Sequence, residues 1–220
     1  MTAPATLDSS PETPAADGGR GSGRRFGLVA VATAVVVGLL LGYAGGLLTP
    51  RLTRPGDDSV EAGFARDMTA HHAQAVEMGL IAFQRATDPE VRTMGGDIAS
   101  GQQGEIGTMQ TWLRLWGLDP TGSQPRMAWM SDGASLVKDG LMPGMATPAE
   151  MTKLRAAQGR EFDLLFLNMM VNHHLGGIHM IDGLLDASDE PDVVRTAQTM
   201  KNTQQTDLTN MRNALKRLGG

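Results

Sequence analysis

All five histidines of the chain lie in two short segments of similar sequence. Residues 68–78 read MTAHHAQAVEM, and residues 170–180 read MVNHHLGGIHM. Imidazole nitrogen binds copper, zinc, iron and nickel, whereas thioether sulfur is a good ligand for Cu(I) and adds little for hard ions. Mixed histidine and methionine ligation therefore predicts a copper site, with another transition metal as the alternative. The candidate ligands are Met68, His71, His72, Met78, Met170, His173, His174 and Met180.

The two segments belong to an internal repeat whose copies are offset by 102 residues. Residue 64 pairs with residue 166, and the register continues without a gap until residue 117 pairs with residue 219. Two polar positions recur in this register, because Gln102 pairs with Gln204 and Glu105 pairs with Asp207. An uninterrupted register of this length indicates a duplicated unit.

Each unit reads as two helices joined by a short turn. An acidic residue precedes a proline at residues 88–89 and again at residues 190–191, which suits an N-cap followed by proline in the first helical turn. Thr147 and Glu150 form a capping box for a third helix, and Gly117 suits the end of the second. These signals predict helices at residues 58–86, 89–116, 148–187 and 190–218.

Residues 118–147 then form a long crossover between the second and third helices. A connection of this length is typical of ferritin-like bundles rather than of simple up-down bundles. The predicted fold is therefore all-α, a ferritin-like four-helix bundle from two helical hairpins. The crossover carries Met127, Met130, Met142 and Met145, which are expected either to offer a mobile methionine surface to Cu(I) or to cap the bundle end.

The helical period places the candidate ligands of each segment within roughly 120° of one helix face. Neighbouring apolar residues point these faces inward, while Glu77 and His179 lie opposite and are expected in solvent. The inward stripes of the second and fourth helices are interrupted by Gln102, Glu105, Gln204 and Asp207. A buried polar group without a partner costs about 1–3 kcal/mol, so these side chains are expected to bond to the histidines. The alternative is a polar core in which the same bonds form without metal.

The pattern of methionine and paired histidines, followed by a helix with Gln and Glu, resembles the bacterial "domain of unknown function 305" family. The resemblance covers residues 57–219, and GREFDLLFLNMMVNHH at residues 159–174 is its most specific part. It implies a ferritin-like fold and, because some relatives are copper-binding proteins of the cell envelope, metal handling. Matching the motif residue by residue implies the same eight ligand candidates.

The N-terminal region divides into an expected disordered tail at residues 1–25, an uncharged apolar segment at 26–48 and a linker at 49–56 before the bundle at 57–220. The apolar segment is long enough to cross a membrane, and its length favours an anchor over a cleaved signal peptide. Arginines before it favour an extracytoplasmic bundle. A stripe of small residues suits a transmembrane partner or a homo-oligomer: Ala30, Ala34, Gly38, Gly42 and Gly46.

Composition narrows the function further. The chain has no cysteine, which excludes disulfides and thiolate metal sites, and it has no basic stripe for nucleic acid. No nucleophile with a placed base and no phosphate-binding loop is present, so an enzyme is the less favoured reading. The leading hypothesis is a membrane-anchored copper-buffering or copper-delivering protein. The alternatives are a structural accessory subunit of a membrane complex and a di-metal redox enzyme, although the Glu-x-x-His motif of such enzymes is missing.

Overall fold

The computed structural model describes residues 22–52 and 54–220, with side chains for residues 27–47 and 54–220. The chain separates after residue 53 into two units, which are described individually. Most of the tail expected at residues 1–25 lies outside the described residues.

The first unit contains α1 (Ser22–Leu52), which includes the apolar segment expected at residues 26–48. Its described side chains are exposed along the whole apolar stretch. Among the residues described, Gly27–Leu47 is the one helical stretch long and apolar enough to cross a membrane. Membrane anchors and signal sequences near an N-terminus share this length and composition, so both fit α1.

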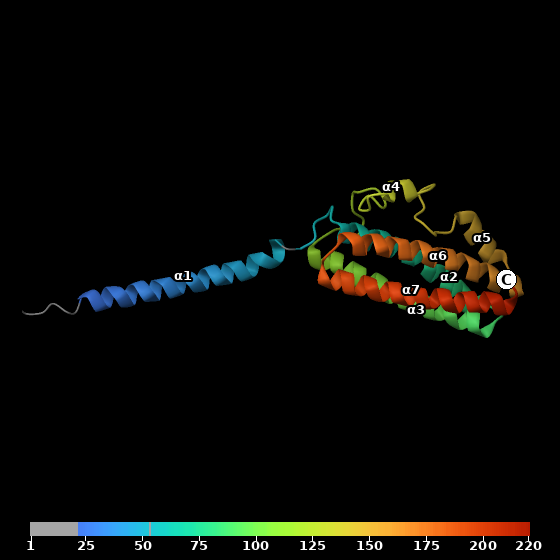
Figure 1. Cartoon of the computed structure of the whole chain (residues 1–220), viewed down its shortest axis with the longest axis horizontal. Coiled ribbons are helices and arrows are strands. Elements are labelled where there is room, and N and C mark those ends of the chain that lie inside the picture. The colour runs from blue at the N-terminus through green and yellow to red at the C-terminus, as the bar shows by residue number, and fades with distance from the viewer. Residues whose placement is uncertain (1–21, 53) are drawn as a thin grey trace, which may run out of the picture. The chain divides into compact units, whose positions relative to one another are not determined.

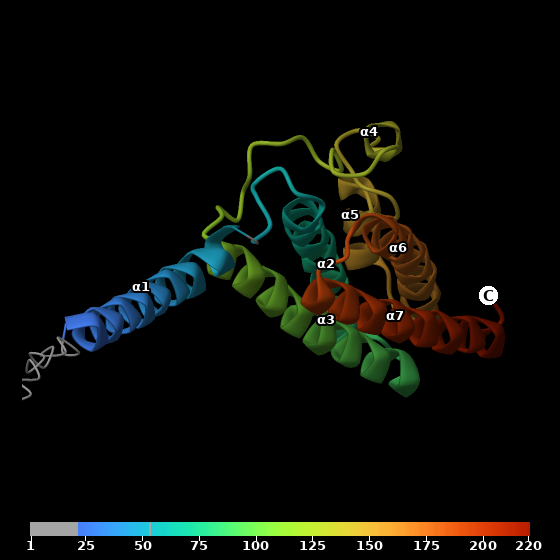
Figure 2. The same ribbon diagram turned by 60° about the vertical axis from the view of Figure 1, so that its left-hand side comes forward.

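The second unit is a bundle of four long helices: α2 (Val60–Arg85), α3 (Pro89–Trp116), α6 (Gly159–Ala187) and α7 (Pro191–Leu218). Helix α2 packs against α3 and α6, and α7 closes the ring by packing against α6 and α3 (Figures 1 and 2). Helices α3 and α7 begin at residues 89 and 191 and end at residues 116 and 218, so both boundaries differ by 102 positions. The predicted all-α class is confirmed.

The capping signals of the first hairpin act as predicted. The Asp88 carboxylate accepts hydrogen bonds from the backbone nitrogens of Glu90 and Val91 at 3.0 and 3.1 Å, and Gly117 ends α3 with φ 76°. Glu190 is the N-cap residue of α7 and Pro191 follows it, as predicted, but the Glu190 side chain makes no capping bond. Glutamate carries one more methylene than the preferred Asp. The Ser188 hydroxyl accepts from the Glu190 nitrogen instead, at 3.3 Å.

The single helix predicted at residues 148–187 is broken into α5 (Pro148–Ala156) and α6. The capping box of Thr147 and Glu150 starts α5 as predicted. Gly159 has φ 58°, in the left-handed region that glycine adopts without strain, and it separates the two helices. The Arg85 guanidinium donates to the carbonyls of Arg155 and Ala157, which the break leaves without helical partners.

The crossover lies along the side of the bundle formed by α2 and α6 and includes the short α4 (Gly133–Leu136) (Figures 1 and 2). The buried Asp67 carboxylate on α2 fixes it by accepting from the Met127 nitrogen at 2.6 Å and the Trp129 indole at 2.9 Å. Met127 and Met142 are buried in the core, so the methionine surface expected there is wrong for these two residues. Their thioethers face apolar side chains rather than solvent.

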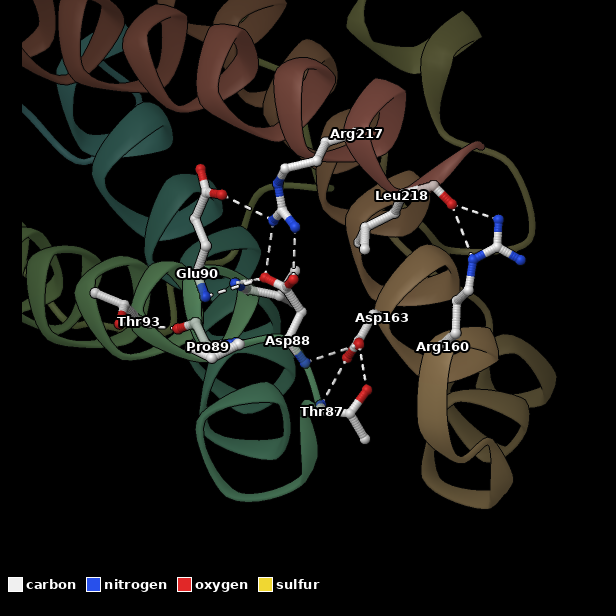
Figure 3. Close-up of polar contacts among 10 residues, drawn as sticks. Thr87, Asp88, Pro89, Glu90, Thr93, Arg160, Asp163, Arg217 and Leu218 are labelled. Atoms are coloured by element: carbon white, nitrogen blue, oxygen red, sulfur yellow. Dashed lines mark hydrogen bonds and ion pairs between the residues drawn. The ribbon is translucent and has the colours of Figure 1, made fainter.

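Polar contacts join the two hairpins at the end of the bundle where α2 turns into α3 (Figure 3). The buried Asp163 of α6 accepts from the backbone nitrogens of Thr87 and Asp88, each at 3.0 Å, and from the Thr87 hydroxyl at 2.5 Å. The Arg217 guanidinium of α7 makes two bonds to Asp88 and lowers the pKa of that carboxyl to about 2. The turn between α2 and α3 is thereby held by both helices of the other hairpin.

The crossover also touches α6 at Gly176, where a side chain has no room. A Cβ atom at Gly176 would overlap the Pro143 carbonyl and lie 2.8 Å from the Gly144 nitrogen. We expect Gly176→Ala to lower the free energy of unfolding by about 1–3 kcal/mol, the usual range for overpacking. Gly101→Ala is the matched control, because that helical position has nothing within 4 Å and should gain about 0.5–1 kcal/mol. Denaturant unfolding measures both, and equal effects would contradict the close contact.

Candidate metal centre

Four imidazole rings lie inside the bundle, contributed in pairs by α2 and α6. His71, His72, His173 and His174 are each at most 1% exposed, as their helical period predicts. The rings of His71 and His173 meet across the two helices, with centroids 3.9 Å apart and planes inclined by 37°. Within each pair the centroids are about 6.4–6.5 Å apart. The two copies of the repeat therefore bring their histidines together in one layer, which we call the histidine layer.

The four candidate methionines are fully buried and are shared between two separate apolar clusters. Met68 and Met180 belong to one cluster, and Met78 and Met170 belong to the other. Each cluster thus takes one methionine from each copy of the repeat. The sequence pattern alone did not reveal this pairing, because it arises from the packing of α2 against α6.

Two histidines donate to acids on the neighbouring helices, as predicted. Nε2 of His72 lies 2.8 Å from the Glu105 carboxylate, and Nε2 of His174 lies 3.2 Å from the Asp207 carboxylate. A carboxylate only accepts hydrogen bonds, so both Nε2 atoms carry the proton. This fixes the tautomer of each ring and leaves its Nδ1 as an acceptor.

His71 has a different acceptor, which the sequence pattern did not predict. Its Nε2 donates to the carbonyl oxygen of Pro143 in the crossover at 3.0 Å. The Gln74 side chain holds the same segment, since its amide donates to the Ala146 carbonyl at 2.8 Å and accepts from the Ala146 nitrogen at 2.7 Å. A backbone carbonyl leaves no trace in residue type. Gln74 did offer a signal, as it lies beside His71 on α2 one turn later.

Every ring of the histidine layer keeps one buried nitrogen without a hydrogen-bond partner. These atoms are Nδ1 of His71, His72 and His174, and Nε2 of His173. In His71, His72 and His174 the partnered nitrogen carries the proton, so the free one is a lone pair when the ring is neutral. Metal-binding histidines have this arrangement, in which the second ring nitrogen donates to a carboxylate or carbonyl. The donor set therefore fits a metal ion.

Burial keeps the central rings neutral. Desolvation, followed by the positive charge that His72 would carry, lowers the pKa of His71 from 6.5 to about 3. Desolvation likewise holds the pKa of His173 well below its ordinary value. Near neutral pH no proton competes for these nitrogens, and binding of a metal to them need not displace one.

The predicted polar residues of α3 and α7 line a small pocket of about 120 Å³ between these two helices. Glu105 and Asp207 are 22% and 26% exposed in it, while their histidine partners are fully buried. Gln102 and Gln204 also line the pocket, and each has a buried amide atom without a partner. The two carboxylates therefore stand between bulk water and the histidines.

The histidine layer does not contain a preformed coordination site for a hard ion. Within residues 22–52 and 54–220, no group of three or more His, Asp or Glu side chains is arranged to hold a metal ion as it stands. Glu61 on α2 and Asp163 on α6 are the two further acids that a di-metal site could use, and both are hydrogen-bonded to other groups. Glu61 accepts from the Ser188 hydroxyl at 2.5 Å, and Asp163 caps the turn between α2 and α3.

We expect the metal-free protein to lose stability in weak acid, because the histidines bind protons at a higher pH in the unfolded chain than in the folded protein. His71 takes a proton near pH 6.5 when unfolded but only near pH 3 when folded. Stability is therefore complete above pH 6.5 and falls as the pH decreases, by up to about 1.4 kcal/mol per pH unit for each such imidazole. Denaturant unfolding with a chelator between pH 7 and 5 tests this. His71→Gln should flatten the slope, and an unchanged slope would contradict the assignment.

Comparison with known proteins places this fold. A model of the domain of unknown function DUF305 matches residues 61–215. The crystal structure of a proposed secreted DUF305 protein from Streptomyces coelicolor is 41% identical in sequence, covers 75% of this chain and 97% of its own, and has a TM-score of 0.69. A DUF305 fragment from Deinococcus radiodurans is 29% identical and covers 72% of this chain and 96% of its own, with a TM-score of 0.60.

Structures of CopM show the same fold at greater distance. The Cu(II)-bound form is 25% identical, covers 72% of this chain and 97% of its own, and has a TM-score of 0.57. The Cu(I)-bound form is 23% identical and covers 74% and 99%, with a TM-score of 0.58. A search of curated proteins found no match. The family model spans most of the chain, and the resemblance first seen in the paired histidines is confirmed: the chain belongs to the DUF305 family.

Proposed function

We propose that this protein binds copper in the histidine layer and buffers the ion or passes it on at the cell envelope. One observation carries the proposal. Each buried ring has a nitrogen without a partner, and in His71, His72 and His174 the opposite nitrogen is fixed by an acceptor. An apolar core gains nothing from such atoms, since a buried polar group left unpaired costs about 1–3 kcal/mol. A metal ion satisfies them.

The methionines make copper the best-supported metal. Met68 with Met180, and Met78 with Met170, place thioethers of both copies in the two apolar clusters of the bundle core. Thioether and imidazole together select Cu(I), which accepts low coordination numbers. CopM, whose fold this chain shares, has been solved with Cu(I), Cu(II) and Ag. These relatives support the proposal without fixing the ligands of this chain.

The surrounding residues would tune the site in separate ways. Glu105 and Asp207 would orient His72 and His174 and fix the tautomer of each ring. Pro143 does the same for His71 through its carbonyl. Bound copper would supply a soft, redox-active cation, and the apolar clusters would limit its access to water. The carboxylates in the pocket between α3 and α7 would attract it electrostatically.

We also propose that α1 retains the protein in the membrane with the bundle on the extracytoplasmic side. The support is its apolar stretch at Gly27–Leu47 and the arginines before it. A buffering or delivering protein would there meet copper before it enters the cell. The small-residue stripe of α1, which ends at Gly46, would be the surface for a helix partner or a second copy.

Replacing His72 and His174 together with Ala tests the copper proposal directly. We expect the affinity for Cu(I) to fall by more than about 100-fold, whereas Glu105→Gln with Asp207→Asn should lower it by about 10–100-fold through loss of orientation. Competition with a chromophoric Cu(I) chelator under anaerobic conditions measures both affinities. If the histidines only pair with the acids, the wild type and the His72 and His174 variant will hold Cu(I) with the same affinity. Copper will then raise the melting temperature of both proteins by the same amount.

The methionines allow a finer test of which oxidation state is bound. Exchange of Met68 and Met170 for Leu nearly conserves volume and should change the unfolding free energy by less than about 1.5 kcal/mol. Thioether ligation would make the same exchange weaken Cu(I) binding far more than Cu(II) binding. Met94→Leu is the control, because that half-buried residue of α3 lies outside the candidate ligand set. Equal losses for the two ions would show that these methionines serve only to pack the core.

A further inference from the structure

The fifth histidine, His179, lies outside the histidine layer, with a side chain 47% exposed on α6. Two surface hollows flank it, with volumes of about 520 and 730 Å³. His179 is the one residue that lines both. Met145 lines the first hollow and Met130 lines the second, and each is half-buried. The crossover thus presents a methionine on either side of a solvent-exposed imidazole.

The second hollow brings soft and charged ligands close to His179. The residue lies one helical turn before Gly183, so both are on the same face of α6. A Cβ atom at Gly183 would lie 3.0 Å from the sulfur of Met130, which therefore packs directly over this face. Nε2 of His179 is 3.9 Å from the Asp132 carboxylate, too far for a hydrogen bond. An ion with bonds of about 2 Å fits between two such ligands.

An ordinary surface ion pair of His179 with Asp132 would leave the partly exposed methionines beside it unexplained. Such pairs contribute about 0–1 kcal/mol and require no methionine. Here Met130 and Met145 both retain partial exposure, whereas Met127 and Met142 of the same crossover are buried. The hollow is also acidic, since Asp182 and Asp186 line it as well, and Lys201 pairs with Asp182 at 2.6 Å. The thioether and the imidazole suit a soft cation, and the carboxylates add negative charge around them.

We infer that His179 and Met130 form an outer copper site in the second hollow, with the Asp132 carboxylate supplying negative charge. It is distinct from the histidine layer and does not depend on copper binding there. The two are neighbours nevertheless. Pro143 lines the first hollow, which His179 also borders, and its carbonyl accepts a hydrogen bond from His71, so the crossover contacts residues of both sites. The outer site would receive Cu(I) from solvent or from a donor protein before the core does.

Anaerobic titration of the full chain with Cu(I) against a chromophoric chelator tests this inference. We expect His179→Ala to remove a single bound Cu(I) relative to the wild type. Met130→Leu should weaken that ion by about tenfold or more while Cu(II) binding changes little. Because His179 is exposed, its replacement should leave the fold intact, which circular dichroism checks. Met94→Leu again serves as the matched control for the methionine exchange.

The outcomes separate the two sites. Loss of the single ion in His179→Ala, with the remaining copper lost only in the His72 and His174 variant, supports both proposals. If the wild type binds one Cu(I) and His179→Ala binds none, the outer site stands and the core proposal fails. If His179→Ala binds as many ions as the wild type with the same affinity, the outer site is overturned.

Discussion

The need to satisfy four imidazole rings inside an apolar bundle governs the rest of this structure. A neutral imidazole has one donor and one acceptor, and burial removes water as a partner for either. The donors of His72 and His174 require Glu105 and Asp207 on the helices opposite. The donor of His71 requires a carbonyl from the crossover. The position of that long segment along α2 and α6 is thus tied to the same demand.

The acceptors of these rings receive no such compensation from the protein. Helix α3 brings Gln102 and α7 brings Gln204 to the same level, yet these amides leave atoms of their own unpaired. Polar groups in this number would not persist in a core whose purpose was stability alone. The methionine clusters add thioether sulfur atoms, which do not need water as a partner and which bind soft metal ions selectively. Burial lowers the pKa of His71 and His173, and a neutral imidazole is the form that can bind a metal ion.

Much of this arrangement followed from the sequence, because helical period and repeat register are local or self-evident properties. They placed the histidines and methionines inside and matched Glu105 and Asp207 to them. The break between α5 and α6 was missed because the local sequence does not show whether Gly159 has a positive φ or the negative φ of a glycine within a helix. The pairing of Met68 with Met180 depends on the packing of two distant helices. The Pro143 contact is made by backbone, which every residue shares.

The Pro143 carbonyl has a consequence for the relation between the two copies of the repeat. By sequence, His71 and His173 are equivalent, yet His71 offers Nδ1 while His173 has its free atom at Nε2. Two identical hairpins associated about a true two-fold axis would present equal ligands, and an arriving ion would have no preferred half. Covalent linkage through an asymmetric crossover removes that degeneracy. The two halves of the proposed site are therefore unequal, and an ion bound there would meet a different nitrogen from each half.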